Sequence, residues 1–203
     1  PQSPAYTVIR HDRAEALARA GRGRDAAELF ENLAKTATGR ERAELLRRSA
    51  EQQLIGGLTR EGFKTLEIAL KAVDAPPPTR IVGMVAEIAR RRVALRIRGY
   101  GFKAIDPLDI DPDAFARVDL FSSASIGTIL TDPLYAYLYS TRALQEALDA
   151  GDPPRAAACL AAEAGMIASK GPRHADWARE LMRRAREVLS LQPTASAAAT
   201  LEF

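Results

Sequence analysis

Arginine is concentrated on one predicted helix, and this cluster is the clearest sign of chemistry in the sequence. Five arginines lie close together there: Arg90, Arg91, Arg92, Arg96 and Arg98. At 100° per residue, Arg92 and Arg96 fall on the apolar side of the helix. Either their methylene groups pack while the charged ends reach solvent, or the two guanidinium groups line a groove. In a groove they would pair with the carboxylates of Asp106 and Asp109 or with an acidic partner.

Two tyrosines on a later helix form a second candidate group. Tyr135 and Tyr139 are separated by one helical turn, so they share a helix face. Aromatic rings that carry hydroxyl groups suit either the edge of a core or a binding groove. The sequence leaves both interpretations open.

The acidic loop after the arginine cluster resembles the opening of a calcium-binding loop, but only there. Asp109, Asp111 and Asp113 alternate as calcium ligands do. The sixth position is Ala114, where a glycine is needed, and the twelfth is Leu120, where a bidentate glutamate is needed. We therefore expect these aspartates to cap a helix and face solvent, and we expect no metal site.

The remaining reactive residue types lack the neighbours that catalysis requires. His11 and His174 stand alone, without a metal-ligand spacing. Cys159 falls among alanines and leucines on a predicted helix, which favours a buried thiol. The glycines at 21–23 and 99–101 lack the flanking strand of a phosphate-binding loop. We expect neither an enzyme nor a cofactor.

Composition places the chain among folded globular proteins. Of its 203 residues, 47% are hydrophobic and 27% are charged, and the net charge is only +3. Nucleic-acid binding would therefore need local clustering of charge. Cys159 is the only cysteine, so no internal disulfide can form, which fits a cytoplasmic location. No apolar run reaches the roughly 18 to 20 residues of a membrane span.

Hydrophobic periodicity predicts an all-α fold of about nine helices with short connections. The expected helices cover residues 7–20, 24–36, 39–55, 59–73, 79–98, 112–130, 133–150 and 153–168, followed by one from Pro172 to about 192. Thr38 with Glu41 predicts a capping box, and Thr59 a further N-cap. Three later helices each start with an Asp-Pro pair, at 111–112, 132–133 and 152–153.

The helix at 79–98 carries apolar residues on two flanks, so we expect it to be sandwiched between neighbours. We expect one helical domain over residues 7–192, made of two helix pairs (7–75), an irregular middle (76–130) and further pairs (131–192). We expect residues 1–6 to be a disordered lead or linker, and residues 193–203 to be a tail or the start of a truncated helix.

A spacing in the mid-thirties recurs, with turn glycines at Gly21, Gly57 and, more weakly, Gly151. The helix pairs around these glycines resemble tetratricopeptide (TPR) repeats, in which small residues stand where two helices cross and a large one follows. The matching residues are Ala14, Leu17, Ala26, Phe30 and Leu33, then Ala50, Gly62, Leu66 and Ala69, then Leu144, Ala147, Ala156 and Leu160. Gln53 departs at a usual aromatic position and Glu163 at a usual small one. The resemblance covers about half the chain and implies a TPR-like α-solenoid.

A second resemblance concerns the middle of the chain. Its residues run Arg96-Ile97-Arg98-Gly99-Tyr100-Gly101-Phe102, an acidic loop, Ser125-Ile126-Gly127 and Asp132-Pro133. This order is similar to the C-terminal helical tail of large bacterial signalling proteins that combine a serine/threonine kinase or regulator with a STAND-type ATPase. In that family the tail is a sensor or scaffold without catalysis. The excess of arginine over lysine suits a GC-rich bacterial genome.

Together these patterns predict a non-catalytic interaction, sensor or scaffold module of a larger bacterial signalling protein. We expect it to bind a protein partner, or an adjacent domain of its own chain, on a concave helical surface and to make no membrane contact. The residues expected on that surface are Arg47, Gln53, Arg92, Arg96, Tyr135 and Tyr139. Two alternatives remain: nucleic-acid binding by the arginine-rich helix 80–98, and small-molecule sensing in a solenoid pocket.

Overall fold

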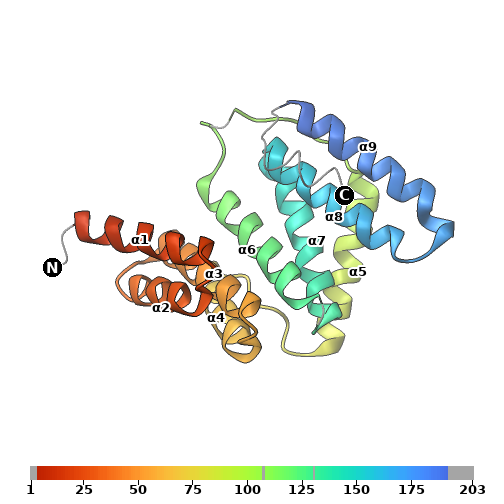
Figure 1. Ribbon diagram of the computed structural model, residues 1–203. Helices are drawn as coiled ribbons and strands as arrows, with labels where there is room; N and C mark the ends of the chain where they lie inside the picture. The colour runs from red at the N-terminus through yellow and green to blue at the C-terminus, as the bar shows by residue number, and fades with distance from the viewer. Residues whose placement is uncertain (1–3, 107, 130, 192–203) are drawn as a thin grey trace.

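The computed structural model describes residues 4–106, 108–129 and 131–191, and all the regular structure in these ranges is helical (Figure 1). The α-helices are α1 (Pro4–Arg19), α2 (Gly23–Ala34), α3 (Gly39–Ile55), α4 (Thr59–Ala72), α5 (Ile81–Arg98), α6 (Pro112–Thr128), α7 (Pro133–Ala150), α8 (Pro153–Ala168) and α9 (Ala175–Leu191). A short 3₁₀ helix, η1 (Pro172–His174), precedes α9. The all-α prediction is confirmed, with helix ends within three residues of those expected.

Two expectations about the chain ends have different outcomes. The expected lead is wrong from Pro4 onward, because α1 already begins there. The expected tail at 193–203 lies outside the described residues. None of the described helices combines the length and the apolar character needed to cross a bilayer.

Aspartate caps set the starts of the later helices as predicted. The side chains of Asp111, Asp132 and Asp152 each accept a hydrogen bond at 3.0 Å from a backbone amide in the first helical turn. The threonine caps differ from the prediction. Thr38 is the N-cap residue of α3, but its side chain accepts no such bond, so the predicted capping box does not form. Thr59 is the first residue of α4 and not its cap.

The helices pack as neighbours along the chain, and the repeat marks their turns. Gly21, Gly57 and Gly151 adopt φ of 74°, 78° and 74° and end α1, α3 and α7. Only glycine adopts this left-handed conformation without strain. The small and large repeat residues on both sides of these turns are buried: Ala14, Ala26, Phe30, Leu33, Ala50, Gly62, Leu66, Ala69, Leu144, Ala147, Ala156 and Leu160.

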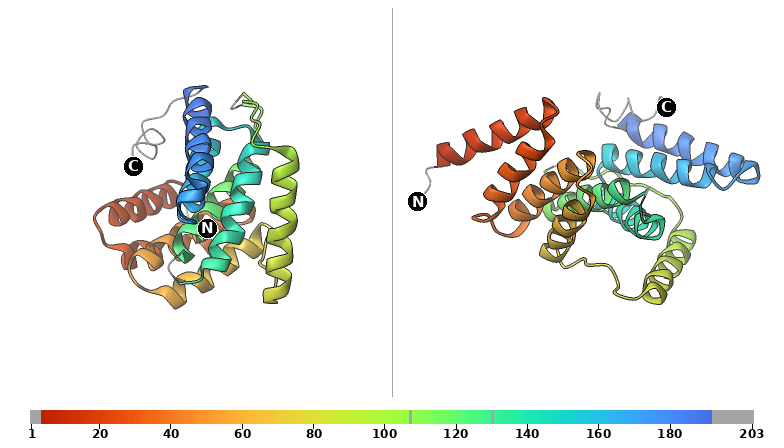
Figure 2. Two further views of the ribbon diagram at one scale, coloured as in Figure 1. Left: turned by 90° about the vertical axis from the view of Figure 1, so that its right-hand side faces the viewer. Right: turned by 60° about the horizontal axis from the view of Figure 1, so that its bottom comes forward.

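The order of packing breaks at α5. It is α6 that packs against α3, whereas α5 lies along α7, at the edge of the molecule (Figure 2). The expectation of a sandwiched helix is therefore wrong: α5 buries only Ile88 and Leu95. The connection before it contributes to this position. Residues 76–78 are three prolines, which keep the chain extended and carry it past the position beside α4.

A buried arginine attaches α5 to α7. Arg142 of α7 donates to both carboxylate oxygens of Glu87 on α5, at 2.9 Å each. It also donates to the carbonyl oxygens of Ala75, at 2.7 Å, and Pro76, at 3.3 Å. The Tyr139 hydroxyl donates to the same Ala75 carbonyl at 3.1 Å. We call this network the Arg142 clasp, and it fixes both α5 and the segment that leads into it.

The clasp keeps Glu87 ionised. Burial alone would raise the pKa of Glu87, but hydrogen bonds from Arg142 and Arg91 outweigh burial, so its pKa lies below the usual value. Arg91 donates to Glu87 and to Gln145 of α7, at 2.7 Å each. The α5–α7 contact is therefore largely ionic and hydrogen-bonded.

We predict that Phe30→Ala destabilises the protein by about 3–5 kcal/mol, because the ring is fully buried in the first helix pair. It packs edge-on against His11, with ring centroids 6.0 Å apart. Urea unfolding measures the loss. Ile55→Ala is the control, since that side chain is 80% exposed and its loss should be within about 0.5 kcal/mol. A loss below about 1 kcal/mol for Phe30→Ala would contradict the repeat assignment.

Candidate functional site

A cavity of about 790 Å³ opens between α5, α7, α8 and α9, and we call it the basic cleft. Its cationic side chains are Arg92, Arg96, Arg98, Lys170 and Arg184. Its aromatic side chains are Tyr100, Tyr137 and Trp177. Glu180 is the only carboxylate among its lining residues. The net charge of the chain is only +3, yet the basic cleft concentrates positive side chains in one cavity.

Arg92 is the best-anchored cation of the basic cleft. Its Nη1 donates to Oε1 of Glu163 on α8 at 2.5 Å, and its guanidinium lies 4.2 Å from the centroid of the Tyr137 ring. The Glu163 side chain is completely buried. Among the described residues, Nε and Nη2 of Arg92 and Oε2 of Glu163 have no hydrogen-bond partner. These three atoms are buried, so the pair is largely withdrawn from solvent.

Glu163 is a residue of the candidate site that the sequence did not identify as one. The sequence did mark this position as unusual, because a glutamate stands where the repeat has a small residue. The pair with Arg92 explains that departure. One of the alternatives for these arginines, pairing with the loop, is wrong, since neither Arg92 nor Arg96 forms an ion pair with Asp106 or Asp109.

The outer part of the basic cleft carries cations with few counter-charges. Arg98 pairs with Asp149 at 2.7 Å, and Arg184 with Glu180 at 3.3 Å. In the described part of the chain, Arg96 and Lys170 have no ion-pair partner within 4.0 Å. These two side chains are available for an anionic ligand.

Arg47 and Gln53 lie elsewhere, at the joints between helices. Arg47 of α3 pairs with Glu51 at 2.5 Å and donates to Ser123 of α6 at 3.0 Å. Gln53 is buried and donates to Glu31 of α2 at 2.7 Å. Both side chains join neighbouring helices, and neither lines the basic cleft.

The two tyrosines pack on each other, with ring centroids 4.7 Å apart. Tyr139 is fully buried and belongs to the core. Tyr135 lines a separate hollow beside the prolines at 76–78. Burial raises the pKa of Tyr135 to about 12, and burial also raises the pKa of Tyr139. Both hydroxyl groups stay protonated at neutral pH, so neither can act as a base.

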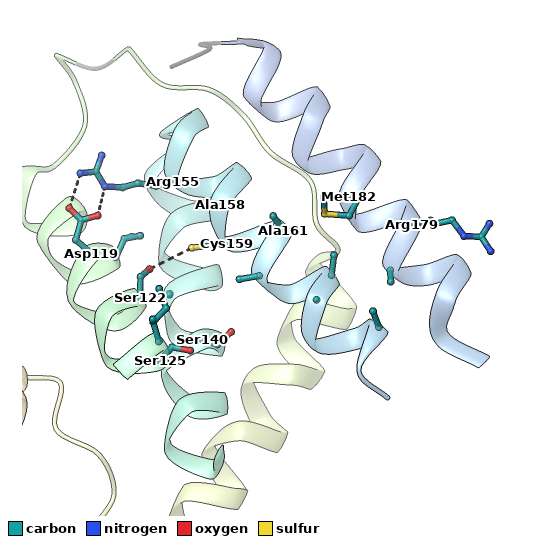
Figure 3. Close-up of a pocket in the computed structure, with 18 residues that line it drawn as sticks. Asp119, Ser122, Ser125, Ser140, Arg155, Ala158, Cys159, Ala161, Arg179 and Met182 are labelled. Carbon is teal, nitrogen blue, oxygen red and sulfur yellow. Dashed lines mark hydrogen bonds and ion pairs between the residues drawn. The ribbon is translucent and has the colours of Figure 1, made fainter. Parts of the chain in front are cut away.

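A second cavity, of about 680 Å³, lies between α6, α8 and α9 (Figure 3), and we call it the apolar pocket. Small apolar side chains form most of its wall, including Ala158, Ala161, Ala162, Ala168 and Ala178. At one end Arg155 pairs with Asp119 at 2.8 Å. Burial raises the pKa of Cys159 to about 12, so its thiol is protonated and a poor nucleophile. The pocket is suited to binding and not to thiol chemistry.

Comparisons of the chain with models of protein families, with curated proteins and with solved structures found no match. A function for this chain therefore has to be inferred from the geometry of the basic cleft and the apolar pocket.

We predict that Glu163→Ala lowers the free energy of unfolding by about 3–5 kcal/mol, since it leaves the Arg92 charge buried without its partner. The double variant Arg92→Met/Glu163→Leu should recover most of that loss, because an apolar pair of similar size has no charge to desolvate. Urea unfolding of both variants measures the difference. Equal losses in the single and double variants would contradict a coupled, dry ion pair.

Proposed function

We propose that the protein is a non-catalytic interaction module that binds an acidic segment of a protein partner in the basic cleft. One observation carries the proposal. Arg92 is oriented by the buried Glu163 and by the Tyr137 ring, and the cations of Arg96 and Lys170, which have no ion-pair partner among the described residues, stand beside it. Oriented guanidinium groups bind carboxylates through charge-assisted hydrogen bonds.

The remaining lining of the basic cleft favours a peptide over a free anion. Trp177 and Tyr100 offer apolar area with polar edges, as aromatic anchors of protein interfaces do. A hollow of about 790 Å³ accommodates several side chains. A peptide that alternates carboxylates with apolar side chains would use both kinds of contact.

The arrangement of the helices supports a degenerate TPR-like solenoid as the framework of this module. Neighbouring helices pack in pairs, and α6 follows α3 and α4 in the stack while α5 stands outside it. Of the residues expected on the binding surface, this proposal retains Arg92 and Arg96, which line the basic cleft beside α5. We further propose that this module is a sensor or scaffold region of a larger protein. That protein would be a cytoplasmic bacterial signalling protein of the STAND ATPase type.

We predict that a fluorescein-labelled peptide of glutamate and tyrosine binds the protein and that Arg96→Glu/Lys170→Glu weakens binding at least about tenfold, or 1.4 kcal/mol. Fluorescence anisotropy measures both affinities. Arg13→Glu/Arg24→Glu is the matched control, because it makes the same charge change at exposed positions of α1 and α2. A lysine–tyrosine peptide should not bind.

Two outcomes would contradict this function. An equal loss in the control variant would mean that net charge, and not the basic cleft, attracts the peptide. Tighter binding of a single-stranded oligonucleotide, lost in Arg96→Glu/Lys170→Glu and falling steeply with salt, would make nucleic acid the ligand.

A specific observation favours a second function, the sensing of a small apolar molecule. The apolar pocket has the size of typical ligand sites, and Ile126 and Met182 add to its alanine-rich wall. Such a ligand would stabilise the folded state, and the stabilisation would grow with the logarithm of its concentration above the Kd.

We predict that Nile red, a neutral apolar dye, binds the apolar pocket with a saturable rise in fluorescence and raises the melting temperature. Ala162→Trp should reduce the response, since the indole fills space beside α8. Ala16→Trp on α1 is the control, because it adds the same ring at an exposed position away from the pocket. An undiminished response in Ala162→Trp would place the dye elsewhere.

A further inference from the structure

The outward side of α5 is an uncovered apolar surface. Val82, Ala86, Ala89, Val93 and Ile97 recur at spacings of three and four residues, so they form one stripe along the helix. All five side chains are exposed, with Val82 at 79% and Ile97 at 84%. We call this stripe the outer face of α5. At 1.5 Å per residue, an 18-residue helix is about 27 Å long.

This surface follows from the position of α5 and is not covered by the rest of the described chain. The helix packs along α7 through Ile88, Leu95 and the Arg142 clasp, all on its other side. Both views in Figure 2 place α5 at the margin of the molecule, with its outward side free of neighbouring helices. Scattered exposed apolar residues are ordinary, but a continuous stripe of this length is typical of a docking surface.

The charges around the outer face of α5 are positive. Arg90 borders the stripe on one side, and Arg96 borders it on the other in the C-terminal half. Neither has an ion-pair partner within 4.0 Å in the described ranges. Glu87 is the only acidic residue of α5, and it is bound by Arg91 and Arg142. The face therefore offers cations to a partner and no free carboxylate of its own helix.

This charge pattern argues against a second copy of the chain on the same face. In a two-fold symmetric contact the same patch meets itself, so Arg90 and Arg96 of one copy would approach the arginines of the other. Like charges at such a contact weaken it. A partner with carboxylates beside its apolar residues has the complementary pattern.

The shape of the stripe favours a helix over a lipid surface. Ala86 and Ala89 are small and lie between the larger Val82 and Val93, so they leave a shallow notch in the middle of the face. Packed helices approach to about 8–10 Å where such small side chains meet. Helices that lie in a lipid interface expose tryptophan, phenylalanine or leucine. The outer face of α5 carries none of these three residue types.

We propose that the outer face of α5 docks an amphipathic helix of a protein partner. The apolar stripe of that helix covers Val82, Val93 and Ile97, and carboxylates beside the stripe pair with Arg90 and Arg96. This surface differs from the basic cleft, although Val93 and Arg96 border both. One partner can use the two surfaces together, but docking on α5 does not require an occupied cleft.

A hydrocarbon-stapled synthetic helix tests the proposal, with leucines on one face and glutamates on the rest. Fluorescence anisotropy should give saturable binding that Val82→Gln/Ile97→Gln weakens at least about tenfold. Ile9→Gln/Ile55→Gln is the matched control, because those side chains are also exposed, at 65% and 80%, and line neither cavity. Circular dichroism should show both variants as folded as the parent, since no core contact is removed.

The same measurements separate this inference from the function of the basic cleft. Lys170→Glu should leave the stapled helix bound, whereas it weakens the acidic peptide in the cleft. Equal binding of the stapled helix to Val82→Gln/Ile97→Gln and to the parent would overturn the inference. So would equal binding of a lysine version of the helix.

Other occupants would also overturn it. A dimer in sedimentation equilibrium that Val82→Gln/Ile97→Gln dissociates would show that a second copy covers the face. Binding to vesicles of neutral and anionic phospholipid that the same variant abolishes would show a lipid surface instead.

Discussion

The position of α5 depends on one buried guanidinium. Arg142 lies inside the protein, where an unpaired charge would be costly, so its donors must find acceptors. Glu87 and the carbonyl groups of Ala75 and Pro76 are those acceptors, and all three belong to α5 or to the segment before it. The arginine thereby decides where an otherwise loosely packed helix lies. Because α5 forms one wall of the basic cleft and carries the outer apolar face, both proposed surfaces rest on this contact.

Arg92 and Glu163 extend the same principle to the far side of the helix. Their ion pair connects α5 to α8, so a polar contact joins the two helices beside the basic cleft. An apolar pair would hold the helices as well, but it would present no cation to a ligand. The retained charge is consistent with the proposed binding site, whereas Arg47 and Gln53 join helices without lining the basic cleft.

The sequence predicted what local chemistry decides. Asp-Pro pairs and turn glycines marked helix ends within a few residues, and the repeat identified core positions such as Phe30 and Leu66. The location of α5 could not be predicted in this way. Periodicity shows which side of a helix is apolar, but not whether another helix covers that side. Glu163 was visible as an irregularity of the repeat, yet its partner Arg92 lies 71 residues away in sequence, and nothing local links the two.

A helix attached mainly by ionic and hydrogen-bonded contacts differs from the others in how it can open. The stack from α3 to α6 does not pass through α5, so α5 can leave α7 without breaking that stack. Its detachment exposes little apolar area, because only Ile88 and Leu95 are buried. We therefore expect the local unfolding of α5 to be separable from global unfolding. A partner that binds the outer face of α5 would suppress this opening. Because α5 also forms one wall of the basic cleft, the same partner would make that wall more rigid.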